Sequence, residues 1–395
     1  MLINTPFIAA LAVGASFHAH QPVSTTALQT LIVGGGPSLE YNQAAIESNV
    51  RYLDRILPVD SSRQILFASG DPNSKTVLCQ DENDHQYFRQ PQIRHIDGPS
   101  ILSEVKARLT ALSDEAAKKP NVPVLLYFTG HGSGDEDSKF TNNKFDLWSQ
   151  NELTVRQLGD SLESFPAGTP ITLVMVECFS GAFGNEIFED GVPDAPLSDH
   201  KICGFFACVP QRMAAGCTPL IKEADYRDFT GYFFAALSGK DRLGRPISGA
   251  DYDHDGKVEM DEAYAYSLIH DDSIDTPVCT SDVFLRRYVK VASDKVCLDQ
   301  PYSKVLSWGT PAQKAALAAL SNTLSLEGED QGKHAYAEFY QNDEESEDPR
   351  AVHLIRFVRL FKTIVLAHDL MTHGEPDIQQ KYKALVALEH RNLLG

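Results

Sequence analysis

Two short, largely apolar runs limit most narrowly how this chain can fold. Residues 122–128 read Val-Pro-Val-Leu-Leu-Tyr-Phe, and residues 171–176 form the second run. A short apolar run without polar alternation is typical of a strand that is buried on both faces of a parallel sheet. Further strand patterns at 29–33 and 64–68 alternate with helix patterns at 43–57, 101–111 and 153–164. This order predicts an α/β fold, a mostly parallel sheet flanked by helices.

Beyond about residue 300 the pattern is helical throughout. Thr310-Pro311 is typical of a helix N-terminus, and an Ala-rich stretch follows it. Two amphipathic helix patterns follow the acidic loop at 341–349. We therefore expect a main domain at 28–300 and an all-helical C-terminal module at 305–395.

Charge and hydropathy exclude two classes of partner. The 395 residues include 35 basic and 54 acidic side chains, a net charge of −19. Such a surface repels phosphate groups, so we expect no nucleic-acid partner. A membrane-spanning helix needs roughly 20 apolar residues, and no run approaches this length, so we expect no membrane span.

The N-terminus and the cysteines indicate export. Residues 7–17 are apolar and small residues precede a possible cleavage point after Ala15, which predicts a signal peptide at 1–15 and a secreted or periplasmic location. No Lys or Arg occurs before Arg51, and a buried or disordered N-terminus is the alternative. Seven cysteines in an exported chain suggest one functional thiol and three disulfides among the other six, with 15 possible connectivities.

Two strand ends carry residues suited to nucleophilic chemistry. The first reads Tyr-Phe-Thr-Gly-His131-Gly132-Ser-Gly, and the second reads Val-Glu177-Cys178-Phe-Ser180-Gly. Ligands bind beyond the carboxyl ends of strands in open α/β sheets. His131 could take the proton of Cys178, whose thiolate is the attacking form, and the amides of Gly132 and Cys178 could form an oxyanion hole. The alternatives are a buried structural thiol and a histidine in an ordinary turn.

This pair of motifs resembles clan CD cysteine peptidases, and within them the legumain family, over about residues 28–290. The resemblance implies a caspase-like fold, a protein or peptide substrate cut by a thiol, and a helical C-terminal prodomain, which would make the chain a zymogen. The alternative for the C-terminal helices is a tail that folds on itself or dimerises. Tyr41-Asn42 follows a Gly-rich turn, as in legumains, where the Asn orients the histidine. The resemblance assigns that role to Asn42, and an ordinary turn residue is the alternative.

The nucleophile turn departs from the legumain pattern. Glu177 stands where legumains have Ala, and Val176 stands where they have Glu, so asparagine specificity is not expected. Glu177 would either meet a basic substrate side chain or form a salt bridge, and we assign Glu177 and Ser180 to the substrate pocket. Two alternatives to peptide hydrolysis stay open. One is transpeptidation, and the other is a non-catalytic calcium-binding interaction protein.

A second motif predicts Ca²⁺. Residues 251–262 match the twelve-residue EF-hand loop. The expected ligands are the carboxylates of the first, third, fifth and twelfth residues and the carbonyl of the seventh: Asp251, Asp253, Asp255, Glu262 and Lys257. Gly-Arg-Pro-Ile-Ser-Gly-Ala precedes the loop and is no helix, which favours a structural site over a sensor. A polar loop that binds nothing is the alternative.

Overall fold

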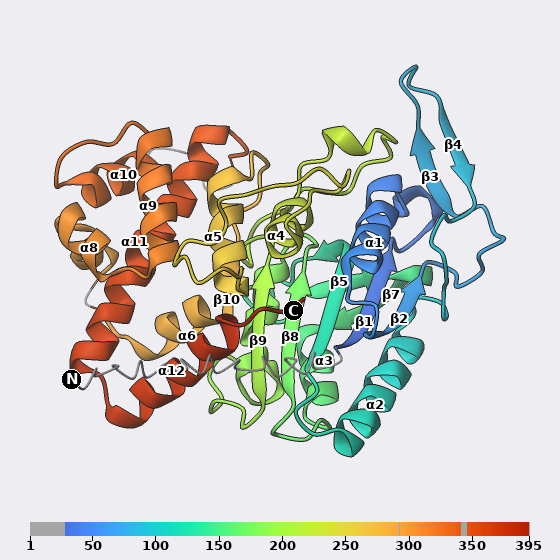
Figure 1. The fold of residues 1–395 in the computed structure, drawn as a ribbon, viewed down its shortest axis with the longest axis horizontal. Coiled ribbons are helices and arrows are strands. Elements are labelled where there is room, and N and C mark those ends of the chain that lie inside the picture. The colour runs from blue at the N-terminus through green and yellow to red at the C-terminus, as the bar shows by residue number, and fades with distance from the viewer. Residues whose placement is uncertain (1–27, 292, 341–345, 395) are drawn as a thin grey trace, which may run out of the picture.

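The computed structural model describes residues 28–291, 293–340 and 346–394. The predicted signal peptide lies outside the described residues. A central sheet runs through the molecule (Figure 1) in the order β10 (Val278–Cys279), β9 (Lys201–Phe206), β8 (Pro170–Met175), β5 (Val124–Ser133), β1 (Gln29–Gly35) and β2 (Ser62–Phe67). Neighbouring strands in this order are parallel except β10, which pairs antiparallel with β9.

Two smaller antiparallel pairs complete the strands. β6 (Lys144–Leu147) pairs with the end of β5 and with β7 (Asn151–Thr154). β3 (Val77–Gln80) and β4 (Gln86–Arg89) form a separate hairpin. The short 3₁₀ helices are η1 (Leu39–Tyr41), η2 (Trp148–Gln150), η3 (Ser180–Ile187), η4 (Glu189–Gly191) and η5 (Glu223–Asp225).

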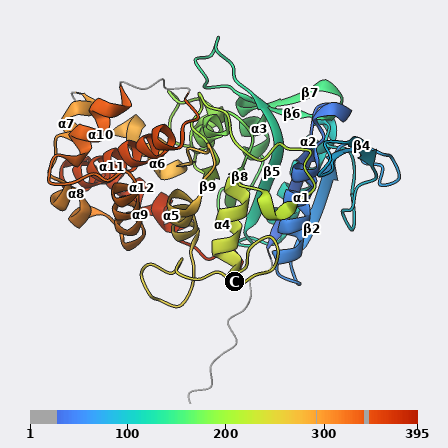
Figure 2. The ribbon, with the colours of Figure 1, turned by 90° about the horizontal axis from the view of Figure 1, so that it is seen from above.

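Alternate strand residues enter two apolar cores, one on each face of the sheet. On β1, Ile32 enters the core with α1 (Ala44–Ile56), α4 (Phe229–Ser238) and α5 (Met260–His270). Leu31 and Val33 enter the opposite core with α2 (Leu102–Lys118) and α3 (Val155–Leu162). Figure 2 shows the sheet between these two helical layers. The expected α/β architecture is confirmed, because strands buried on both faces need helices on both faces.

The C-terminal helices gather beside the β9–β10 edge of the sheet (Figure 1). They are α6 (Thr280–Tyr288), α7 (Asp294–Leu298), α8 (Tyr302–Trp308), α9 (Pro311–Thr323), α10 (Gln331–Phe339), α11 (Pro349–His373) and α12 (Pro376–Glu389). Their apolar side chains join the core of the sheet: Leu317 and Phe361 belong to one buried cluster with Phe205 of β9. These helices share a buried cluster with the sheet, and the division into 28–300 and 305–395 stays a prediction.

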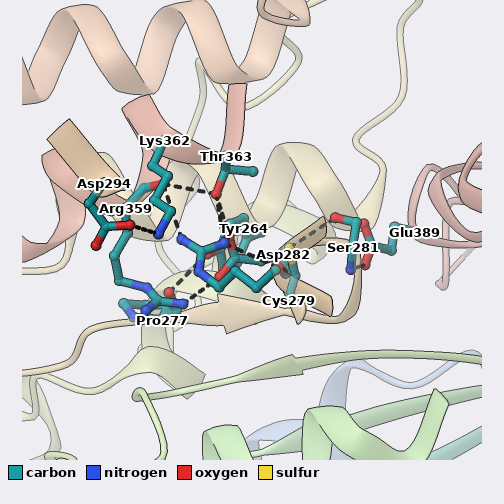
Figure 3. A network of polar contacts seen from close by, with 11 residues as sticks. Tyr264, Pro277, Cys279, Ser281, Asp282, Asp294, Arg359, Lys362, Thr363 and Glu389 are labelled. Carbon is teal, nitrogen blue, oxygen red and sulfur yellow. Dashed lines mark hydrogen bonds and ion pairs between the residues drawn. The ribbon is translucent and has the colours of Figure 1, made fainter. Parts of the chain in front are cut away.

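Buried polar contacts fasten the same helices to the sheet edge (Figure 3). Asp282 at the start of α6 is 3% exposed and accepts hydrogen bonds from Arg286, Arg359 and Thr363. Glu389 Oε1 of α12 accepts hydrogen bonds from Thr280 Oγ1 and the Ser281 amide, both at 2.7 Å. Since α6 follows β10 directly, these contacts hold the last strand in place.

The structure bears on two expectations from composition, the absence of a membrane span and the presence of disulfides. In the described parts of the chain, no helix has both the length and the apolar character needed to cross a bilayer. All seven cysteines are free thiols, so the three expected disulfides are wrong for this structure. Several thiols contact hydroxyl groups instead: Cys203 with Thr172, Cys208 with Ser180, and Cys279 with Ser281.

We predict that a chain ending at residue 304 does not fold. The cut removes α9, α11 and α12 and exposes core residues such as Leu268 and Phe284. Each large apolar side chain lost from a core costs about 2–5 kcal/mol, while a whole domain is stable by only about 5–15 kcal/mol. Loss of the cooperative thermal transition checks this. A folded, more active truncated protein would instead support the prodomain interpretation.

Candidate active site

The carboxyl ends of β1, β5 and β8 meet at one edge of the sheet. The strand order reverses between β1 and β5, because the chain passes from β1 to β2 on one side and then to β5 on the other. Ligands bind at such switch points in open α/β sheets. Tyr41 to Gln43 follow β1, His131 lies near the end of β5, and Cys178 comes three residues after β8. The structure therefore brings the motifs of the sequence to one edge of the sheet.

The Cys178 thiol is half-buried and held by one backbone unit. The Ala214 amide donates a hydrogen bond to Sγ at 3.3 Å, and Sγ lies 3.7 Å from the Ala214 carbonyl oxygen. Burial raises the pKa of Cys178. The thiol is therefore protonated near neutral pH, and nucleophilic attack requires a base.

A strained turn follows the thiol. Phe179 has φ of 62°, in the left-handed region that an aromatic residue rarely adopts. Its amide donates to the Arg212 carbonyl at 2.8 Å, and its carbonyl accepts from Asn143 Nδ2 at 3.0 Å. Asn143 is fully buried and also donates to the Pro210 carbonyl at 2.9 Å. Asn143 was not among the predicted site residues, because it lies 36 residues from Phe179 along the chain.

The surroundings of His131 fix its tautomer. Nε2 lies 3.0 Å from both the Tyr41 carbonyl oxygen and Gln43 Oε1. Both partners are acceptors, so Nε2 carries the proton and Nδ1 is left as the base. Burial lowers the pKa of His131, which keeps the imidazole neutral. Within the described residues no hydrogen bond joins Sγ of Cys178 to the imidazole, although His131 lies near the end of β5 and Cys178 follows the neighbouring strand β8.

Asn42 does not contact His131, which corrects the role that the resemblance assigned to it. Its side chain is fully buried, where Nδ2 donates to the Thr76 carbonyl at 2.9 Å and Oδ1 accepts from the Gly36 amide at 3.3 Å. Asn42 thus closes the turn after β1, and the residues on either side of it reach the imidazole. Gln43 was missed, and only its position beside Tyr41-Asn42 pointed to it.

Gly132 makes room for the nucleophile turn. A Cβ atom there would lie 2.3 Å from the Cys178 carbonyl oxygen and 2.6 Å from Glu177 Cγ. The two backbone segments are therefore in contact, which only glycine permits. Among the hydrogen bonds of the described residues, none uses the Cys178 amide. That amide is available to a ligand.

Glu177 and Ser180 point into the protein interior, so their assignment to the substrate pocket is wrong for this structure. Glu177 is 1% exposed, and neither carboxylate oxygen has a hydrogen-bond partner among the described residues. Burial, together with the nearby charge of Asp146, raises the pKa of Glu177 well above its usual value. Ser180 is fully buried and accepts from the Cys208 amide at 3.4 Å.

Exposed apolar side chains, rather than Glu177 and Ser180, lie beside Cys178 and His131. Tyr41 is 54% exposed, and its ring meets that of His131 edge to face at 5.4 Å. Met213, next to the residue that holds Sγ, is also 54% exposed. A cavity of 270 Å³ adjoins Met213 and Phe179. These surfaces suit an extended peptide with apolar side chains.

The predicted calcium loop gathers its carboxylates. Ligand oxygens of Asp251, Asp253 and Asp255 lie within 4.8 Å of one another, as do those of Asp253, Glu259 and Glu262. Gly256 adopts φ of 92°, and its amide donates to Asp251 Oδ2 at 3.1 Å. The loop leads directly into α5, and residues 247–250 before it are not helical.

Two buried oxygens in this loop have no hydrogen-bond partner among the described residues: Asp251 Oδ1 and Glu259 Oε2. Burial and the neighbouring Glu262 raise the pKa of Glu259 to about 7. Unpartnered buried carboxylate oxygens fit a hard cation such as Ca²⁺. Glu259, the ninth residue of the loop, was missed as a candidate ligand, although that position is often used in EF-hand loops.

Comparison with known proteins finds similar solved structures but no similar sequences. No protein-family model matches the sequence, and no curated protein matches it. Similar solved structures include a Geobacter sulfurreducens protein, with 14% identity, 64% of this chain and 92% of that chain covered, and a TM-score of 0.37. Caspase-1 from Spodoptera frugiperda has 12% identity, with 58% of this chain and 75% of that chain covered, and a TM-score of 0.31. A secreted C11 cysteine protease from Bacteroides thetaiotaomicron has 13% identity, with 80% of this chain and 82% of that chain covered, and a TM-score of 0.33. These values are low, so the function proposed below depends on this chain's own residues.

We predict that Gln43→Glu moves the acid limb of the kcat/KM profile to higher pH by about one unit. Neutral imidazole is the base, so activity rises with pH through the His131 pKa, which burial places below its usual value. A carboxylate beside Nε2 favours the imidazolium and raises that pKa. Steady-state kinetics from pH 4 to 9 measure the limb. As the control, Asn42→Ser should lower the melting temperature and leave the acid limb at the same pH. An unshifted acid limb in Gln43→Glu would contradict the contact between Gln43 and His131.

Proposed function

We propose that this chain is a cysteine endopeptidase of the caspase-like class, with Cys178 as nucleophile and His131 as general base. The observation that carries the proposal is the imidazole whose Nε2 is tied to two acceptors, at the end of the strand beside the one that presents the thiol. This arrangement supplies an oriented base for a thiol whose pKa burial has raised.

The reaction follows from these roles. Nδ1 of His131 removes the thiol proton while sulfur attacks the scissile carbonyl, and the carbonyl oxygen becomes an oxyanion. The amides of Gly132 and Cys178 stabilise this charge, a contribution of about 3 kcal/mol per donor in related sites. The imidazolium then protonates the leaving amine and the C–N bond breaks, which leaves a thioester. Water, deprotonated by His131, cleaves the thioester and releases the carboxylic acid and the free thiol.

Transpeptidation is the alternative outcome of the same acyl-enzyme, with an amine in place of water. Product analysis in the presence of an added amine separates the two. The apolar rim formed by Tyr41 and Met213 supports peptides with apolar residues near the scissile bond as substrates. A non-catalytic calcium-binding protein would show neither product.

We also propose that the loop at 251–262 binds Ca²⁺ through Asp251, Asp253, Asp255, Glu262 and the Lys257 carbonyl, with Glu259 as a further ligand. When bound, the ion would neutralise carboxylates that repel one another in its absence. Because the loop leads into α5, which packs against α4 and α9, the ion would stabilise the fold. It takes no part in the steps above.

We predict that Cys178→Ala abolishes peptide cleavage, with a loss on the order of 10³-fold or more, because no other side chain of the nucleophile turn is a comparable nucleophile. His131→Ala should be nearly as damaging. A peptide-library screen with the purified protein measures both. Cys297→Ala, which changes a buried thiol of α7, serves as the matched control and should keep its activity. Activity retained by Cys178→Ala would remove the assignment.

We predict that Ca²⁺ raises the melting temperature. At a hundredfold excess over its dissociation constant, a ligand stabilises the folded state by about 2.7 kcal/mol. Glu262→Gln should reduce this response, whereas Asp114→Asn, which changes an exposed acid of α2, should leave it unchanged. Calorimetry with Ca²⁺ and with a chelator makes the comparison. Equal melting temperatures in both would argue against the site.

A further inference from the structure

We infer that helix α11 of the C-terminal region positions the backbone that holds the Cys178 thiol, through the buried residues Arg356 and Asp275. The inference rests on the proposed role of Cys178. It adds two positioning residues to the cysteine and histidine, and it makes the C-terminal helices a working part of the site instead of a cover over it.

Arg356 binds three backbone carbonyls of one loop. Its side chain is fully buried, and the loop, residues 271–277, joins α5 to β10. Nε donates to the Asp275 carbonyl at 2.8 Å, Nη2 donates to the Ser273 carbonyl at 3.2 Å, and Nη1 donates to the Asp271 carbonyl. A planar guanidinium can serve three acceptors in fixed directions at once, which an ammonium group cannot. Arg356 therefore determines the path of this loop.

Asp275 in turn positions the loop after β9, residues 207–217, by accepting a hydrogen bond from it. Its Oδ1 accepts from the Ala215 amide at 2.7 Å, and its Oδ2 accepts from the Phe229 amide at 2.8 Å. Thr276 Oγ1 accepts from the Val209 amide at 3.3 Å. Asp275 and Thr276 are fully buried, so no water can replace the amides as their hydrogen-bond partners.

The loop after β9 contacts the thiol directly. Ala214, the neighbour of Ala215, donates its amide to Cys178 Sγ at 3.3 Å. An N–H that bonds to sulfur favours the thiolate over the thiol. Direct contacts thus run from α11 through Arg356, Asp275 and Ala215 to the atom that would attack the substrate.

The same helix offers a matched control. Arg359 also anchors α11 to the rest of the molecule, through Asp282 of α6 (Figure 3). Its guanidinium binds Asp282, which lies outside the loop at 271–277. A substitution of Arg359 therefore tests the general anchoring of α11, and a substitution of Arg356 tests the connection to the thiol as well.

The test compares Arg356→Lys with Arg359→Lys in the full-length protein, since both keep the charge. The rate at which iodoacetamide alkylates Cys178 is followed by mass spectrometry as a function of pH. In Arg356→Lys the midpoint pH of this profile should rise by an amount that corresponds to an about five-fold decrease in the acid dissociation constant of the thiol. Arg359→Lys should leave the midpoint pH unchanged. An unchanged midpoint in folded Arg356→Lys, or an equal shift in both variants, would overturn the inference.

This readout needs no peptide cleavage, so failure of the inference and failure of the proposed peptidase activity are distinguishable. A second measurement covers the case in which Arg356→Lys does not fold. Native-state hydrogen exchange of the unmodified protein in rising denaturant should show segment 213–217 losing protection in the same opening event as α11. Opening of α11 while 213–217 stays protected would refute the connection.

Discussion

Parallel pairing of β1, β5 and β8 is the constraint on which the rest of the structure depends. It brings three strand ends to one edge, and each end carries a different element of the candidate site. The pairing also buries both faces of these strands, so helices must cover both faces. Gly132 adds a local condition, since the end of β5 can approach the nucleophile turn only without a side chain at that position.

Much of the framework could be predicted from local sequence. The apolar runs at 122–128 and 171–176 became β5 and β8, and Thr310-Pro311 became the N-terminus of α9, where Thr310 forms a capping box with Gln313. These features depend on neighbouring residues and on hydrophobicity alone. The positions of Cys178, His131 and the loop at 251–262 relative to strands and helices followed from the same kind of reasoning.

The supporting residues could not be found in this way. Asn143, Gln43 and Asp275 act through side-chain direction and through partners that are 36 to 88 residues away. A one-residue difference in turn geometry decided whether Asn42 or Gln43 reaches the imidazole. Arg356 did leave one signal, a charged residue among the apolar side chains of α11, which is the kind of residue that is buried only when it has strong partners.

The shared core has a consequence for how the protein is made. The Met260 amide at the start of α5 bonds to the Arg391 carbonyl, and Leu393 lies in the same core as Leu28. Residues from both ends of the described chain therefore contribute to one core. A ribosome-bound chain that lacks the last helices would have the thiol and the histidine but not their final support. Synthesis order would then delay catalytic competence until translation has passed α12, without any cleavage step.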